Sequence, residues 1–185
     1  MKFLLNPFRL ALGLFSLLLL SACFESEKPL FPAGSAASPL PDSFKIQLDP
    51  ATDPQAVGVV KKSGEQYIVY GQDGQPRYEM TFINLGTGDP NTYMVQNKGD
   101  GFEFSGYAYA FARVRSYGVY YYSPSCSNDL SSAERASLGH ADIYRPGLPD
   151  WKSCDFTIIT QVEDALRLVE PRTVLTEAHL HAFIN

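Results

Sequence analysis

The sequence predicts a mostly β domain of the α+β class, in which an antiparallel meander forms a sandwich or barrel and a short helical C-terminal portion follows. Short alternating runs of apolar residues from 44 to 122, turn residues at regular intervals between them, and helix-capping motifs after residue 130 predict this class. A length of 185 residues allows one ordinary domain with appendages. With a net charge of −5, the chain lacks the basic footprint of nucleic-acid binders, so we expect no nucleic-acid partner.

The β portion is expected to contain seven strands. Tyr78, Met80 and Phe82 alternate with more polar residues, which places the three side chains on one face of a strand. The expected strands are 44–48, 56–61, 66–70, 77–84, 92–97, 102–112 and 114–122, and turn residues at 63–64, 73–74, 85–91 and 98–101 separate most of them. The boundary between the last two strands carries no turn signal at Ala112-Arg113.

Capping motifs predict helices in the C-terminal part. Residues 131–134 (Ser-Ser-Ala-Glu) have the capping-box pattern, and Gly139 is typical of the end of a short helix. The further elements that we expect are a strand over 156–159, a helix from a second capping box at 160–163 through Val169, with Val162, Ala165, Leu166 and Val169 on one face, and a final helix over 174–184.

The N-terminal 22 residues have the architecture of a secretory signal peptide. Lys2 and Arg9 form a basic start, and an unbroken uncharged run, Leu10–Leu20, follows. The alternative is a transmembrane helix, which needs about 20 apolar residues. Because Glu25 follows the apolar run closely, we favour a signal peptide over residues 1–22.

The end of this segment, Leu20-Ser21-Ala22-Cys23, resembles the lipobox of bacterial lipoproteins, in which small residues precede a cysteine. The resemblance implies that Cys23 becomes the mature N-terminus and carries a diacylglyceryl thioether and an N-acyl chain such as palmitate. It also implies a membrane anchor in the cell envelope, on the outer membrane facing the periplasm where a cell has two membranes, because Phe24 rather than Asp follows Cys23. The alternative is a buried or disulfide-bonded Cys23 in an ordinary secreted protein.

Residues 23–43 contain four prolines and no apolar periodicity. We therefore expect a lipid-anchored flexible tether over this segment, followed by a single β-rich domain over residues 44–185.

Assigning Cys23 to a lipid leaves Cys126 and Cys154 as a pair in an exported protein. We expect a disulfide between them, and the alternative is two separately buried thiols.

No arrangement of residues predicts catalysis, so we expect no catalytic residue, no metal site and no cofactor. His179 and His181 would share a face only on a strand, and Ser137, His140 and Asp142 have triad residue types without evidence of triad geometry. The carboxylate pairs that could meet across a glycosidase cleft are Asp89 with Asp100 and Asp150 with Asp155, and the sequence favours neither.

Tyrosines concentrate in the meander, where ten of the eleven lie between Tyr67 and Tyr122. They favour an aromatic groove for a sugar, peptidoglycan or an apolar ligand, or they reflect the strand propensity of tyrosine. In a strand, Arg113, Arg115, Tyr117 and Tyr121 share one face, which would be a recognition strip or a solvated surface.

These observations lead to a lipid-anchored envelope protein as the first hypothesis. We expect it to be non-catalytic, binding an envelope protein or peptidoglycan, or supporting an assembly at the membrane. The alternatives are an envelope hydrolase that acts on cell-wall material and a small-molecule carrier with an aromatic-lined barrel.

Overall fold

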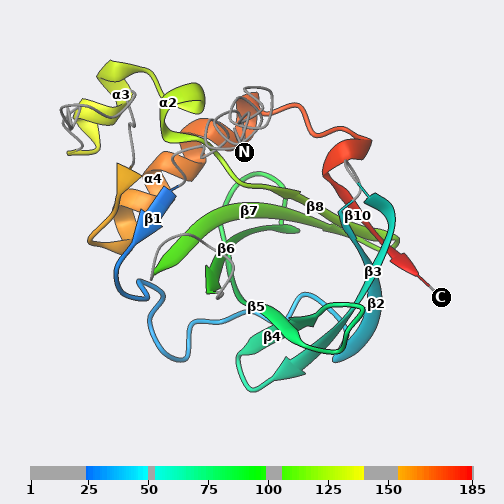
Figure 1. The fold of residues 1–185 in the computed structure, drawn as a ribbon. Coiled ribbons are helices and arrows are strands. Elements are labelled where there is room, and N and C mark those ends of the chain that lie inside the picture. Colours follow the sequence, from blue (N-terminus) through cyan, green and yellow to red (C-terminus); the bar gives the residue numbers. More distant parts are fainter. Residues whose placement is uncertain (1–23, 50–52, 99–105, 140–153, 185) are drawn as a thin grey trace, which may run out of the picture.

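Eight strands of this computed structural model close into an antiparallel barrel (Figure 1). The structure describes residues 24–49, 53–98, 106–139 and 154–184. Seven consecutive strands form the expected meander: β2 (Ser43–Asp49), β3 (Asp53–Ser63), β4 (Gln66–Tyr70), β5 (Pro76–Asn84), β6 (Thr92–Lys98), β7 (Tyr107–Arg115) and β8 (Gly118–Tyr122). An eighth strand, β10 (Leu180–Ile184), pairs with both β8 and β2. The mostly β fold is confirmed. The meander forms a barrel, one of the two architectures that the sequence allowed, and not a sandwich.

The two faces of β7 pack into two different cores. Ala110 and Ala112 face the barrel interior, whereas Tyr109 and Phe111 belong to a second core on the outer side of the barrel. Successive side chains of a strand point to opposite faces, so the alternation of small and aromatic residues assigns each type to one core. The small inward side chains leave space in the barrel, and the aromatic outward ones bind a layer of helices.

That helical layer comes from the segments after β8. It consists of α2 (Cys126–Asp129), α3 (Ser132–Ser137), α4 (Ile159–Val169) and two 3-10 turns, η2 (Glu170–Arg172) and η3 (Glu177–His179). The four apolar residues expected on one face of α4 are all buried in the outer core, beside Phe111. Figure 1 shows α4 in orange across the outer side of the barrel wall.

The first capping box is confirmed. The Ser131 side chain accepts from the Glu134 backbone N–H, and Gly139 follows α3 with a φ of +83°. Glu134 also accepts from Arg172 at 2.9 Å, and this bond, together with the bonds to Ser131, lowers the pKa of Glu134 to about 2. Glu134 therefore ties α3 to η2 as well as capping its own helix.

Residues 24–26 form a strand rather than the start of a tether. β1 (Phe24–Ser26) pairs antiparallel with β7 and parallel with β9 (Cys154–Asp155). The Phe24 side chain is fully buried, and its ring meets the edge of Phe156 with 5.2 Å between centroids.

The rest of the expected tether, residues 27–42, runs along the barrel from β1 to β2, and we call it the strap. The backbone N–H groups of Leu30 and Phe31 donate to Gln96 Oε1, Ala37 forms a bridge with Phe82, and Leu40 is buried. The expectation of a free tether over 23–43 is thus wrong for its described part, residues 24–43. Prolines remove periodicity from the strap, but they do not prevent single apolar side chains from docking.

Three local expectations also differ from the structure: the strand boundary at Ala112-Arg113, the strand over 156–159 and the second capping box. β7 continues to Arg115 and turns at Ser116-Tyr117, so Ala112-Arg113 is not a strand boundary. Residues 156–159 are not a strand, because the chain turns there and α4 begins at Ile159; Gln161 Oε1 accepts from the Thr157 N–H at 3.3 Å in place of the expected second capping box. Residues 102–105, which opened another expected strand, lie outside the described residues.

The final helix expected over 174–184 is replaced by η3 and the strand β10. The edges of β2 and β8 offer unpaired backbone groups, and β10 satisfies both edges at once. Phe183 also gains a partner in the barrel, the ring of Phe44 at 5.0 Å. Tertiary pairing therefore overrides the helical tendency of this segment.

The expected disulfide between Cys126 and Cys154 is present, with 5.6 Å between the Cα atoms. Both cysteines are fully buried in the outer core. Since Cys154 is the partner of Phe24 in the pairing of β9 with β1, the bond fastens this small sheet to α2. Within the described residues, no helix is long and apolar enough to cross a membrane.

Removing the disulfide should destabilise the protein and loosen β1. We expect a Cys126→Ala, Cys154→Ala variant to lose about 3–4 kcal/mol of unfolding free energy, because the bond closes a loop over a sequence separation of 28 residues. Urea unfolding measures this loss. Amide hydrogen exchange should accelerate in β1 and β9 more than in β3 and β4. An equal acceleration in all four strands would contradict the conclusion that the disulfide holds β1 and β9 in place.

Candidate functional site

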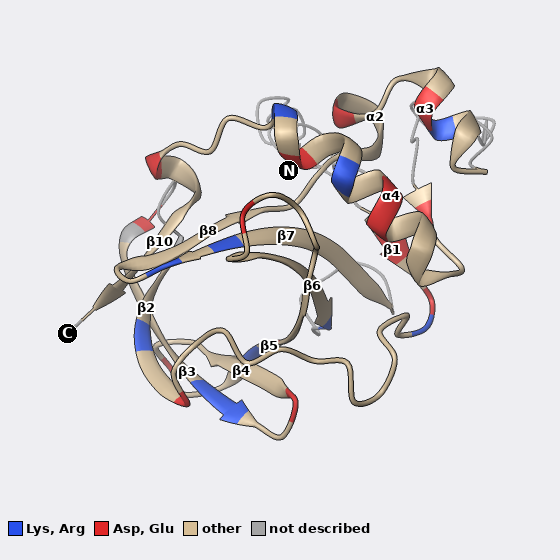
Figure 2. Cartoon of the chain, turned by 180° about the vertical axis from the view of Figure 1, so that it is seen from behind, with Lys and Arg blue, Asp and Glu red and all other residues tan. Residues whose placement is uncertain are grey.

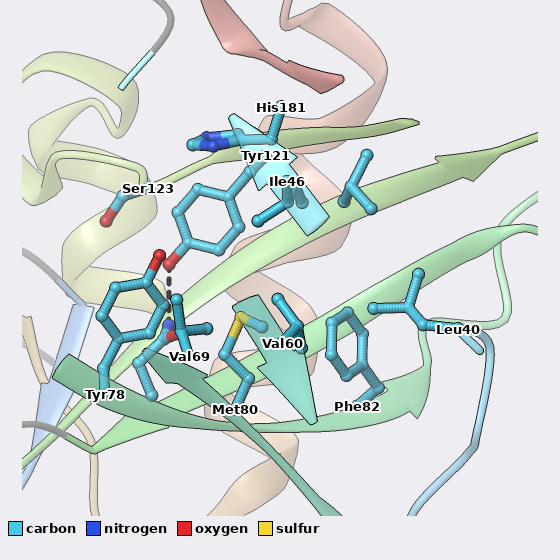
Figure 3. Close-up of a pocket in the computed structure, with 12 residues that line it drawn as sticks. Leu40, Ile46, Val60, Val69, Tyr78, Met80, Phe82, Tyr121, Ser123 and His181 are labelled. Atoms are coloured by element: carbon cyan, nitrogen blue, oxygen red, sulfur yellow. Dashed lines mark hydrogen bonds between the residues drawn. The ribbon is translucent and has the colours of Figure 1, made fainter. Parts of the chain in front are cut away.

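The barrel encloses a cavity of about 250 Å³. Its walls come from seven barrel strands, from the strap and from the residue after β8 (Figure 3). The lining residues are Leu40, Ile46, Val60, Val69, Tyr78, Met80, Phe82, Asn97, Val119, Tyr121, Ser123 and His181. For comparison, a dry apolar cavity of about 150 Å³ binds benzene, and pockets for drug-sized ligands begin near 300 Å³. The space therefore fits a small molecule between these sizes.

One end of the barrel is closed by the strap. The Tyr67 hydroxyl donates to the Leu40 carbonyl at 2.8 Å and accepts from the Leu40 N–H, while the Tyr67 ring is fully buried. The Tyr67 and Phe82 rings meet edge to face at 5.6 Å, and the Ala37 N–H donates to the Phe82 carbonyl. These contacts seal the end of the barrel where β2 begins and β5 ends.

The polar residues of the cavity gather at the other end. The Asn97 side-chain amide donates to the Tyr121 hydroxyl at 2.7 Å, and the Tyr121 ring packs edge to face against His181. His181 Nδ1 lies 2.9 Å from the Gln47 carbonyl, which only accepts, so Nδ1 carries the proton in the neutral ring. Ser123 is exposed at this end, and the cavity therefore reaches solvent here. We call Tyr78, Asn97, Tyr121, Ser123 and His181 the open end.

The cavity is built for an uncharged ligand. Figure 2 shows lysine and arginine positions within several barrel strands, yet none of the described lining residues is Asp, Glu, Lys or Arg. Strand alternation turns most of these side chains outward, and Lys62, which shares the face of Val60, pairs with Asp42 at the closed end. Burial raises the pKa of Tyr78 above its usual 10.0, which keeps this hydroxyl neutral at physiological pH. An ionic group in the cavity would lose its hydration without gaining an opposite charge.

The expected recognition strip does not form one surface. Tyr121 on β8 faces the cavity, whereas Tyr117 lies in the exposed turn before β8. Arg113 and Arg115 are on β7 and point away from the cavity. The strip fails because the chain reverses at Ser116-Tyr117, which the sequence does not signal.

Both arginines are engaged in ion pairs. Arg113 Nε donates to Glu170 Oε1 at 2.9 Å, and the Glu170 side chain is almost fully buried. Arg115 donates to Asp89 at 2.6 Å, and this bond, more than the other contacts, lowers the pKa of Asp89. The two pairs fasten η2 and the loop between β5 and β6 to the barrel, which is a structural role.

The other candidate residues do not form a catalytic or metal site within the described parts of the chain. His179 packs against the Tyr122 ring at 5.4 Å, while His181 lies at the cavity, so the two rings have different surroundings. Ser137 is exposed on α3. In the ranges that the structure describes, no group of three His, Cys, Asp or Glu residues could hold a metal ion. The candidates outside the described residues are Cys23, Asp100, His140, Asp142 and Asp150.

The sequence indicated one wall of the cavity and two residues of its open end, Tyr78 and Tyr121, but not Asn97, Ser123 or His181. The alternation of Tyr78, Met80 and Phe82 placed them on one face, and all three line the cavity. Asn97 could have been found by the same alternation on β6, two residues after the inward-facing Val95. His181 carried no such signal, because the segment was expected to be helical.

Comparison with known proteins gives no relative for this chain. No protein-family model matches the sequence, and no significant match was found among curated proteins or solved structures.

Arg113 should contribute to stability and not to ligand binding. We expect Arg113→Met to cost about 3 kcal/mol of unfolding free energy, because it leaves the buried Glu170 carboxylate without its guanidinium partner. The matched control, Arg115→Met, removes a more exposed pair with Asp89 and should cost about 1 kcal/mol or less. Urea unfolding gives both values. Equal losses in the two variants would refute this ranking.

Proposed function

We propose that the protein is a lipid-anchored envelope protein whose barrel binds a small, uncharged, mostly apolar molecule. The observation that carries the proposal is the apolar cavity of about 250 Å³ inside a closed barrel, with hydrogen-bonding groups at one end only. Among the hypotheses from the sequence, this favours the small-molecule carrier over partner binding through a Tyr/Arg surface, since both arginines are held in ion pairs.

The lining chemistry supports a ligand with an apolar body and one polar group. The apolar body would contact Val60, Val69 and Met80, where burial contributes about 25 cal/mol for each Å² of apolar surface. The polar group would lie at the open end, where the Asn97 amide and the Tyr78 hydroxyl line the cavity. A ligand of this size should bind with a dissociation constant in the range of roughly 1–100 μM.

A matched pair of fluorescent probes tests the cavity. Phenylnaphthylamine is uncharged and apolar, and anilinonaphthalene sulfonate adds one sulfonate to the same skeleton. We expect the neutral probe to bind at least about tenfold more tightly, because no Lys or Arg side chain lines the cavity to pair with the sulfonate.

Filling part of the cavity should weaken probe binding. In Val60→Phe the larger ring occupies part of the cavity, whereas in the control Val59→Phe the neighbouring side chain points to the outer face of β3. We expect the first variant to weaken phenylnaphthylamine binding by about tenfold or more and the second to leave it unchanged. Thermal unfolding verifies that both variants are folded, and full binding by Val60→Phe would overturn the proposal.

The anchor is proposed from the lipobox resemblance, and it has its own test. Cys23→Ser should abolish metabolic labelling with palmitate and the mass increase expected for the lipid. Cys126→Ser, which leaves Cys23 in place, is the control and should retain the label. A Cys23→Ser variant that still incorporates palmitate would exclude this cysteine as the attachment site.

A further inference from the structure

The strand β1 lies at the open end of the cavity. β6 pairs with one edge of β7 from Tyr107 to Arg113, so β1 and β8 must share the other edge, one after the other. Ala108 on β7 pairs with Asn97 on one side and with Glu25 on the other. Since neighbouring strands lie about 4.8 Å apart, the Glu25 backbone is about 10 Å from that of Asn97.

The register also places β1 next to the last residues of β8. Tyr122 pairs with Phe111, and Phe24 pairs with Tyr109 two residues further along β7. At about 3.4 Å per residue, Phe24 follows Tyr122 by about 7 Å along the same edge. The neighbours of Tyr122 in the chain, Tyr121 and Ser123, both line the cavity.

Residue 23 is joined directly to Phe24, which is held firmly in the fold. Phe24 is fully buried, paired on two sides, and covered by the Phe156 ring. A lipid on Cys23 would join the fold through the peptide bond of Phe24, with no free residue between them. The anchor would therefore hold the barrel by its open end.

The surface around β1 does not rely on charge for membrane contact. Ile158, which follows β9 on this side, is 54% exposed, and an apolar side chain of this kind suits a lipid interface. Glu27, Lys28 and Asp155 are exposed beside β1, so charged side chains of both signs lie there and give no strong attraction to anionic headgroups. The lipid itself would supply the attachment.

We propose that the open end of the cavity is held at the surface of the membrane that carries the Cys23 lipid, and that the barrel exchanges its ligand directly with the bilayer. The ligand class is then an uncharged, lipid-soluble small molecule that partitions into the membrane. This inference rests on the proposed lipid anchor and on the proposed cavity function. It adds the direction of ligand exchange, which neither of them requires.

A spacer between the anchor and the fold tests the inference. A flexible Gly-Ser spacer of about 15 residues inserted between Cys23 and Phe24 spans about 20 Å and releases the open end from the bilayer. The matched control carries the same peptide after Asn185. Both lipidated proteins are reconstituted in neutral phosphatidylcholine vesicles, and phenylnaphthylamine uptake from the bilayer is followed by energy transfer from the protein's aromatic residues.

We expect uptake to be about tenfold slower with the N-terminal spacer than with the C-terminal one, because the cavity no longer adjoins the probe in the membrane. Equal rates in the two proteins would overturn the inference while the cavity function stands. Loss of probe binding by both proteins in detergent micelles would overturn the cavity function, and absence of the lipid mass on Cys23 would overturn the anchor.

Position relative to the bilayer gives a second, independent readout. In a Trp151→Phe background, Gln72→Trp places a tryptophan in the turn after β4 at the open end, and Ser63→Trp places one at the closed end. Both positions are exposed. We expect brominated lipids to quench the tryptophan at position 72 more strongly, and stronger quenching at position 63 would overturn the proposed orientation.

Discussion

The closure of the barrel by β10 is the constraint on which the rest of the structure depends. β10 pairs with β8 on one edge and with β2 on the other, so a single short strand satisfies two rows of backbone groups. It also brings His181 to the cavity and Phe183 to the interior. Gly118 permits this approach, because a Cβ there would lie 2.7 Å from the His181 carbonyl oxygen. The same strand, β10, therefore encloses the cavity and supplies His181 to its polar end.

A second dependence runs outward through β7. The same alternation that leaves only alanines on part of its inner face presents Tyr109 and Phe111 to the helical layer. The Tyr109 hydroxyl bonds to Ser26 and Gln96, which holds β1 and the strap against the barrel. The strap then closes the far end through Leu40. The cavity thus owes its closed end to a chain of contacts that begins on the outside of the barrel.

The sequence predicted those features that depend on the spacing of residues within a single helix or strand. The inward face of β5, the cap of α3 and the buried face of α4 follow from spacing within one element, and each is found. The strap and β10 depend on partners far along the chain. The prolines of the strap remove the apolar periodicity that would have indicated that Leu40 is buried. No pattern near Leu180–Ile184 indicates that this segment pairs with the edges of β2 and β8. The polar end of the cavity was missed in part for the same reason, since it joins residues of β5, β6, β8 and β10.

The disulfide links these contacts to the site of the proposed lipid anchor. β1 has only three residues, so its own hydrogen bonds cannot hold it against the barrel without support from neighbours. One neighbour, β7, belongs to the barrel, and the other, β9, is fastened by the bond from Cys154 to Cys126. A protein that hangs from residue 23 would transmit every displacement of its lipid to this small sheet. If Cys23 carries the proposed lipid, the covalent bond beside Phe24 would hold the orientation of the cavity as well as stabilise the fold.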